Sequence, residues 1–248
     1  AARDQVAPES EPQQKRGRGR PRKAPHFGFD KDVIEELPEV PYTEHHQIAK
    51  DQRFREDLAL LVAQHPEDPA LRDFVPELKN HLLARLRGHD FNGEEHEFTD
   101  KDRMQVIVVS NRIYRHKCVR INYTTYDMRR DQDTINPRTR ADVMVLNPGE
   151  HEKPKDEQHP YWYARVCGVF HANVVYTGPG STTRQPQRME FLWVRWFGIE
   201  PGTENPWKRL RLPLVGFVPD DELGAFGFLD PQHVIRGVHM ILAFSFGR

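Results

Sequence analysis

The chain has 248 residues, of which 37% are hydrophobic and 29% are charged. Its 36 Lys and Arg residues nearly cancel its 37 Asp and Glu residues, so no overall positive field would draw nucleic acid to the molecule as a whole. The apolar stretches are short and interrupted by charge, which excludes a membrane-spanning helix of about 20 apolar residues. Two cysteines cannot form a disulfide framework and no signal sequence is visible, so we expect a nuclear or cytosolic protein.

Residues 1–31 are predicted to form a disordered tail. Pro, Gln, Glu and Arg dominate this segment, and few large apolar side chains are available for a core. Every residue from Lys15 to Lys23 is Lys, Arg, Gly or Pro. The chain therefore combines one concentrated basic arm with a body of balanced charge.

This basic run resembles an AT-hook, whose core sequence Arg-Gly-Arg-Pro stands at residues 18–21. The resemblance implies binding to AT-rich double-stranded DNA. The physics agrees, because a narrow minor groove concentrates negative potential, glycine permits a close approach and proline keeps the chain extended. The residues assigned to the minor groove are Arg18, Gly19, Arg20 and Pro21. The residues assigned to the phosphates are Lys15, Arg16, Arg22 and Lys23. The alternative interpretation is a solvated basic tail that serves only as a nuclear-import signal.

Residues 32–93 are predicted to form a linker followed by a small helical hairpin. From Glu44 to about Gly88, apolar residues recur every three to four positions, as on one face of a helix. The proline-containing segment at residues 65–69 interrupts this pattern. A second helix is predicted to begin after Phe74 and Val75, with Pro76 in its first turn, and to end near Gly88.

Residues 94–248 are predicted to form an antiparallel β-barrel, although the same pattern also fits a sandwich. Short segments alternate apolar and polar residues, turn signals separate them, and no long helix intervenes. The predicted strands are residues 104–109, 119–126, 141–146, 161–170, 173–176, 189–197 and 238–244. The predicted fold class is therefore α+β, with a disordered basic N-terminal arm, a small helical hairpin and a C-terminal β-barrel.

Two of these strands resemble the bromo-adjacent homology (BAH) domain. One lies within residues 159–170, and the other carries the sequence Val194-Arg195-Trp196-Phe197. The resemblance covers residues 140–200 and implies a BAH-like barrel that docks a chromatin protein such as a histone. Residues 198–202 read Gly-Ile-Glu-Pro-Gly, where the family has an Arg-Pro-Glu-rich turn. No ligand-binding residue is therefore carried over from the family.

The chain also resembles a family of proteins from mushroom-forming (basidiomycete) fungi, many of them encoded beside transposon genes. The matching stretches are residues 74–86, 122–133, 159–165 and 234–239. This resemblance implies a transposon-associated origin, with a transposase as one candidate partner, and implies no particular activity.

Four aromatic residues form a candidate ligand surface. They are Tyr161, Tyr163, Trp193 and Trp196. Aromatic rings can hold a methylated lysine through cation–π attraction, but they can equally fill the core of a barrel. Alternation along a strand puts Tyr161 and Tyr163 on one face and separates Trp193 from Trp196. At most about half of the aromatic residues are therefore available to a ligand.

Catalytic and metal-binding patterns are weak. Cys167 and His171 stand four residues apart, which on a strand separates them by about 13 Å, too far for one metal ion. Asp127, Asp131 and Asp133 are interleaved with arginines, which favours a solvated loop, with phosphate contact as an alternative, over a nuclease-like cluster. No catalytic residue, metal site or cofactor is predicted.

The sequence predicts a non-catalytic, nuclear DNA- or chromatin-binding protein. The AT-hook would bind AT-rich double-stranded DNA, and the barrel would dock a histone or another protein. Two alternatives stay open. One is a transposon-encoded accessory protein whose folded body binds DNA ends, and the other is an enzyme with an undetected site in the barrel.

Overall fold

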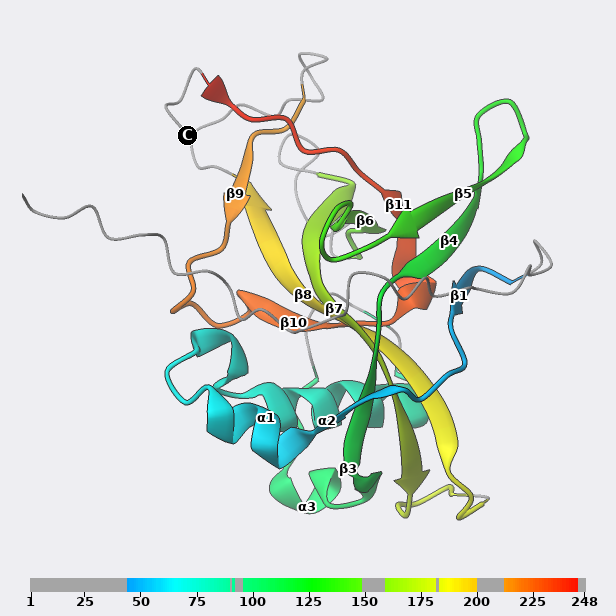
Figure 1. The fold of residues 1–248 in the computed structure, drawn as a ribbon, viewed down its shortest axis with the longest axis vertical. Coiled ribbons are helices and arrows are strands. Elements are labelled where there is room, and N and C mark those ends of the chain that lie inside the picture. Colours follow the sequence, from blue (N-terminus) through cyan, green and yellow to red (C-terminus); the bar gives the residue numbers. More distant parts are fainter. Residues whose placement is uncertain are drawn as a thin grey trace, which may run out of the picture. The chain divides into compact units, whose positions relative to one another are not determined.

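The structure, a computed structural model, describes residues 44–89, 91, 96–148, 159–181, 183–199 and 212–244. The chain divides into two units, residues 1–34 and 35–248, and the fold given below is that of the second unit. The predicted AT-hook and disordered tail lie outside the described residues. In the described part, the expected α+β class is confirmed, since antiparallel strands dominate and helices are few (Figure 1).

The larger sheet has the strand order β10-β8-β7-β3-β2, and each neighbouring pair is antiparallel. Its strands are β2 (Phe54–Asp57), β3 (Val106–His116), β7 (Tyr161–Tyr176), β8 (Gln187–Ile199) and β10 (Phe226–Leu229). Three short strands extend it, with β6 pairing β7, β11 pairing β6, and β9 pairing β8. These are β6 (Asp142–Leu146), β9 (Val215–Phe217) and β11 (Val234–Gly237).

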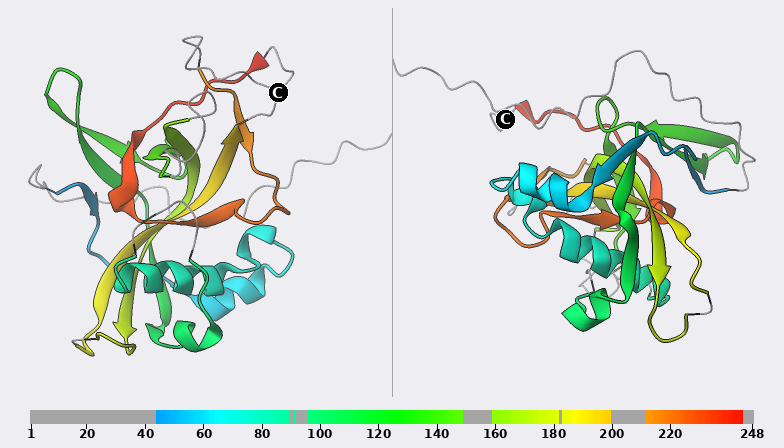
Figure 2. Two further views of the ribbon diagram at one scale, coloured as in Figure 1. Left: turned by 180° about the vertical axis from the view of Figure 1, so that it is seen from behind. Right: turned by 60° about the horizontal axis from the view of Figure 1, so that its bottom comes forward.

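A smaller sheet has the order β1-β4-β5, with β1 (His46–Ile48), β4 (Val119–Thr124) and β5 (Arg130–Ile135). Among the described strands, none of these three pairs with a strand of the larger sheet. The predicted barrel is therefore wrong, because the hydrogen-bonded ladder stops at the edges of two separate sheets. The two sheets nevertheless pack on each other around one core (Figure 2).

The predicted helical hairpin is present, but its first helix is shorter than expected. Helix α2 (Phe74–Leu86) begins two residues earlier than expected, while Pro76 in its first turn and its end before Gly88 are as expected. Helix α1 (Leu58–Gln64) is short, and Asp57 caps it by accepting hydrogen bonds from two backbone N–H groups. The residues before it form β1 and β2 instead of helix, because they pair with β4 and β3 across the sheets.

Two further strand predictions also change. Residues 238–244, which were expected to close the sheet, contain no strand, and Ile241 and Phe244 are exposed. Strand β5 forms within the stretch that we expected to be a loop, because it pairs with β4 along its whole length and buries Ile135. Short helical segments complete the described elements: η1 (Pro69–Leu71), α3 (Asp100–Arg103) and η3 (Pro231–His233).

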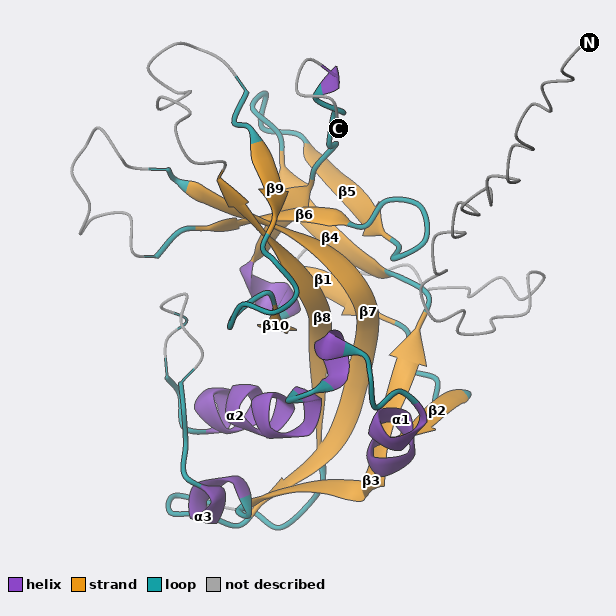
Figure 3. Cartoon of the chain, turned by 90° about the vertical axis from the view of Figure 1, so that its left-hand side faces the viewer, coloured by secondary structure: helices purple, strands orange, loops and turns teal. Residues whose placement is uncertain are grey.

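The long strands β7 and β8 pair with each other through the middle of the fold (Figure 3). Each face of this pair contacts a different core. One face packs against the smaller sheet. The core between this face and the smaller sheet contains buried residues from both sheets: Ile48, Val119, Ile121, Ile135, Val143, Val145, Ala164, Val166, Val169, Leu192, Val194, Leu229 and Val234. On the opposite face, Phe74 of α2 meets Trp193 and Phe228 edge-on at 5.3 and 5.0 Å between ring centroids. An irregularity between Val166 and Gly168 interrupts the pairing with β8.

Candidate functional site

The residues assigned to DNA, from Lys15 to Lys23, lie outside the described residues. The four aromatic residues of the candidate ligand surface are described, and the structure does not gather them at one place. Trp196 lies on the inner face of β8, where it meets Trp162 edge-on at 5.9 Å and packs against the core. Trp193 lies on the other face and is 7% exposed beneath α2.

Tyr161 and Tyr163 lie on the outer face of β7, which is also the face of Trp193, and both are partly exposed. His159 meets the ring of Tyr163 edge-on at 5.8 Å. Burial raises the pKa of the Tyr163 hydroxyl above its usual value. The outer face therefore exposes two tyrosines to solvent. Neither Trp193 nor Trp196 lies exposed beside them, so the four residues do not form an open aromatic cage.

The same outer face carries a set of arginines stacked on aromatic rings. Its members are Arg165, Arg195, Phe197, Phe217 and Phe226, which we call the arginine–aromatic face. The guanidinium of Arg195 lies 4.3 Å from the ring centroid of Phe217, and that of Arg165 lies 5.1 Å from the same centroid. Phe217 also stacks on Phe197 at 4.3 Å. Sequence reasoning missed these partners, because β9 and β10 are short and far along the chain from β7.

Each arginine of this face also has an acidic partner. Arg165 donates two hydrogen bonds to Asp142, at 2.7 and 2.9 Å, and these bonds raise the pKa of its guanidinium. Arg195 donates to Asp220. The protein's own cations therefore lie on the rings of Phe197, Phe217 and Phe226, where a methylated lysine would be repelled by like charge. This arrangement does not favour a methyl-lysine cage.

Cys167 and His171, whose spacing argues against a shared metal ion, are both held uncharged by burial. Burial raises the pKa of the Cys167 thiol to about 11, so the thiolate is scarce at neutral pH. His171 is fully buried, and its Nδ1 lies 2.7 Å from Nε2 of His116. Burial lowers the pKa of His171 to about 3. In the described part of the chain, no three or more His, Cys, Asp or Glu side chains form a metal-binding group.

The acidic residues of the β4–β5 region do not converge either, because each has its own partner. Asp127 accepts a hydrogen bond from Thr125 and pairs with Arg129 at 2.8 Å. Asp131 accepts one from the hydroxyl of Tyr123 at 3.2 Å, and Asp133 accepts one from a backbone N–H at 2.9 Å. They are held along the hairpin and not around a common point.

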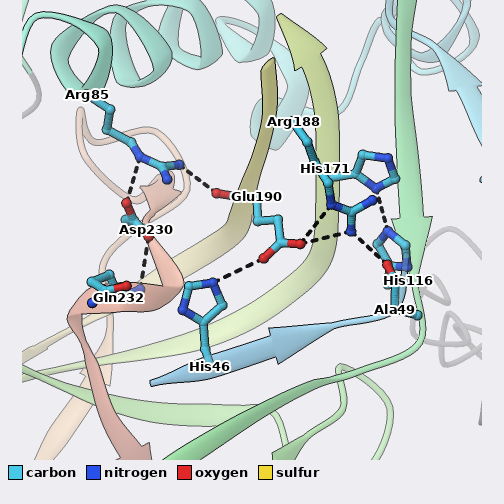
Figure 4. Close-up of polar contacts among 9 residues, drawn as sticks. All are labelled: His46, Ala49, Arg85, His116, His171, Arg188, Glu190, Asp230 and Gln232. Carbon is cyan, nitrogen blue, oxygen red and sulfur yellow. Dashed lines mark hydrogen bonds and ion pairs between the residues drawn. The ribbon is translucent and has the colours of Figure 1, made fainter. Parts of the chain in front are cut away.

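A polar joint holds β1, α2, β8 and η3 together (Figure 4). The carboxylate of Glu190 contacts His46 at 3.1 Å and accepts a hydrogen bond from Arg188 at 2.9 Å. Burial alone would raise the pKa of Glu190, but the bonds from His46 and Arg188 outweigh this effect and lower it. Arg85 donates to the backbone oxygen of Glu190 at 2.6 Å and pairs with Asp230 at 2.6 Å.

The polar joint was not predicted, because the contacts of Glu190 with His46, of Arg85 with Glu190 and of Arg85 with Asp230 join residues 144, 105 and 145 positions apart, which share no local motif. Its charged groups pair with one another, which is the arrangement expected of a buried structural network, while Nδ1 of His46 is buried without a hydrogen-bond partner among the described residues. We therefore infer that the polar joint stabilises the packing of β1, α2, β8 and η3.

Comparison with protein-family models, with curated proteins and with solved structures finds no match to this chain. No helix among the described residues is long and apolar enough to cross a membrane. The functional assignment therefore depends on the chain's own sequence and geometry.

Proposed function

We propose that this protein is a non-catalytic, nuclear DNA- or chromatin-binding protein. The observation that carries the proposal is the basic run from Lys15 to Lys23, with Arg-Gly-Arg-Pro at its centre. Such a segment suits the narrow, electronegative minor groove of AT-rich DNA. A single short arm binds weakly, so the folded body would add a second contact to chromatin.

Features of the folded body support a binding role over catalysis. Burial keeps Cys167 in its thiol form and His171 neutral. The β7–β8 strands that carry the resemblance to the BAH domain form the spine of the fold. We propose on this basis that the body is BAH-like in its role, docking a chromatin protein, although its sheets do not close into a barrel.

Fluorescence anisotropy with AT-rich and GC-rich duplexes, each at two salt concentrations, tests the proposal. The variant Arg18→Ala/Arg20→Ala is expected to lose the AT preference, because it lacks the side chains assigned to the groove. The matched control Lys15→Ala/Lys23→Ala is expected to keep the preference and weaken binding to both duplexes. Its log–log salt slope should fall by about 1.8, since two phosphate contacts are lost.

The result that contradicts the hook is full AT selectivity in Arg18→Ala/Arg20→Ala. In that case the folded body reads DNA itself, and the transposon-encoded accessory protein becomes the better interpretation. Absence of DNA binding by the intact chain would leave the basic run as an import signal only.

A further inference from the structure

The β4–β5 hairpin extends away from the rest of the strands and ends in a tightly bonded turn (Figures 1 and 2). The N–H of Met128 donates to the carbonyl of Thr125 at 3.0 Å, and the N–H of Thr125 donates to the carbonyl of Arg129 at 2.7 Å. The Thr125 hydroxyl also accepts a bond from the N–H of Arg129 at 3.1 Å and donates its single proton to the carboxylate of Asp127. Three hydrogen bonds that involve the turn's backbone therefore give it a defined shape.

This turn presents two large apolar side chains to solvent. Tyr126 is fully exposed and Met128 is 82% exposed. Met128 also has a φ of +62°, in the left-handed region where such turns usually carry Gly or Asn. A bulky residue in that conformation is strained, and here no packing within the described residues compensates for the strain. A contact outside the folded chain would account for both features.

The hairpin, residues 119–135, contains three arginines and three aspartates and therefore has no net charge, but two of its arginines are not paired. The three aspartates are engaged within the chain, whereas the side chains of Arg120 and Arg130 have no hydrogen-bond or ion-pair partner among the described residues. Thr124 faces Arg130 across the hairpin, and Arg120 lies four residues before Thr124 on β4. The two arginines therefore share one face, about 13 Å apart, and would reach different phosphates.

We propose that the β4–β5 hairpin is a DNA-binding wedge that inserts Tyr126 and Met128 into the minor groove at a base step and bends the duplex. Arg120 and Arg130 would contact the flanking phosphates. This inference rests on the proposed DNA-binding function and adds to it a second contact, made by the folded body.

DNA fits this tip better than a protein partner does. A stable protein interface buries about 800 Å² on each side, which is more than the two side chains of a narrow turn can supply. Minor-groove proteins, in contrast, use one or two apolar side chains to separate a base step, with arginines on the backbone nearby. The bend that results exposes more backbone to the rest of the protein.

The test is the end-to-end distance of a fluorescently labelled duplex of about 25 base pairs with a central TA step, a flexible step that is easily kinked. The full chain is expected to bring the duplex ends closer, as an increase in energy transfer. The variant Tyr126→Ser/Met128→Gly is expected to abolish this increase and to weaken binding about tenfold. Glycine suits the left-handed position and both side chains are exposed, so the variant should stay folded.

Leu223→Ser is the matched control, because Leu223 is an equally exposed apolar side chain, at 96%, on a different loop. It is expected to bend DNA like the unmodified chain. Arg120→Ala/Arg130→Ala is expected to lower the log–log salt slope by about 1.8 on AT-rich and GC-rich duplexes alike.

Two results would overturn the wedge: undiminished bending by Tyr126→Ser/Met128→Gly, or a duplex that stays straight although the full chain binds it with AT preference. The second result would leave the hook intact and point to a protein at the tip. Loss of AT preference in Arg18→Ala/Arg20→Ala with bending retained would support the wedge and the hook separately. If the full chain binds no DNA, the proposed function and this inference both fall.

Discussion

Asp230 connects two elements of the polar joint, because it pairs with Arg85 of α2 and caps η3. Its Oδ2 accepts a 2.6 Å bond from Nε of Arg85, and its Oδ1 accepts a 2.9 Å bond from the N–H of Gln232, capping η3. The two charged side chains are 26% and 14% exposed. Burial lowers the pKa of Arg85, and the nearby carboxylates of Asp230 and Glu190 oppose this effect.

The change Asp230→Ala removes both bonds and leaves the half-buried guanidinium of Arg85 without its paired carboxylate, although Glu190 stays nearby. Breaking a fully buried ion pair costs about 3–5 kcal/mol, and we expect about 2 kcal/mol here because water still reaches part of Arg85. Loss of the cap adds about 1 kcal/mol. The free energy of unfolding should therefore fall by about 3 kcal/mol.

Asp230→Asn separates the two contributions, because asparagine still caps η3 but carries no charge. It should cost about 2 kcal/mol. Urea denaturation followed by circular dichroism measures the free energy of unfolding of both variants. On heating, the melting temperature should fall by about 6–12 °C for Asp230→Ala and by about 4–8 °C for Asp230→Asn. An Asp230→Asn midpoint equal to that of the unmodified chain would refute the reasoning, because the ion pair would then contribute nothing.

Three further predictions concern the β7 strand and buried histidines. Gly168→Ala should destabilise the fold by more than about 2 kcal/mol, since a Cβ there would lie 2.3 Å from the buried ring of Phe170; a melting temperature within 2 °C of the unmodified chain would contradict this. Burial lowers the pKa of His81 and of His171 from 6.5 to about 3, so the unfolded chain binds more protons between these values. The stability they contribute is therefore complete above pH 6.5 and is lost as the pH falls, by up to about 1.4 kcal/mol per pH unit for each; urea midpoints that stay constant from pH 7 to pH 5 would argue against it. Because burial raises the pKa of Cys167 to about 11, iodoacetamide should label it at pH 8 far more slowly in the folded than in the urea-unfolded chain, as followed by mass spectrometry.

The sequence was most informative where a local pattern decides the structure. The spacing of leucines in residues 74–86, with Pro76 early and Gly88 after the end, was sufficient to predict α2. Alternation of apolar and polar residues located the main parts of β3, β4, β6, β7 and β8. It also separated Trp193 from Trp196, which lie on opposite faces of β8 in the structure.

Local patterns failed where a distant partner decides. The sequence His46–Ile48 resembles one turn of a helix, yet it forms a strand because β4 offers its edge and the core accepts Ile48. Residues 238–244 have the composition of a strand, but none of the described strands pairs with them. The expected barrel was wrong for the same reason, because a sheet closes into a barrel only if its edge strands pair with each other.

By its sequence alone, the chain determined its α+β class, its basic arm with the AT-hook pattern, and the periodicity of its longest elements, because these depend on neighbours within a few residues. Only the tertiary structure decided that the strands form two sheets, that arginines cover the aromatic rings of the outer face, and that Tyr126 and Met128 stand exposed on a rigid tip. These features depend on contacts between residues far apart in the chain, or on burial, and neither is encoded in any short stretch of sequence.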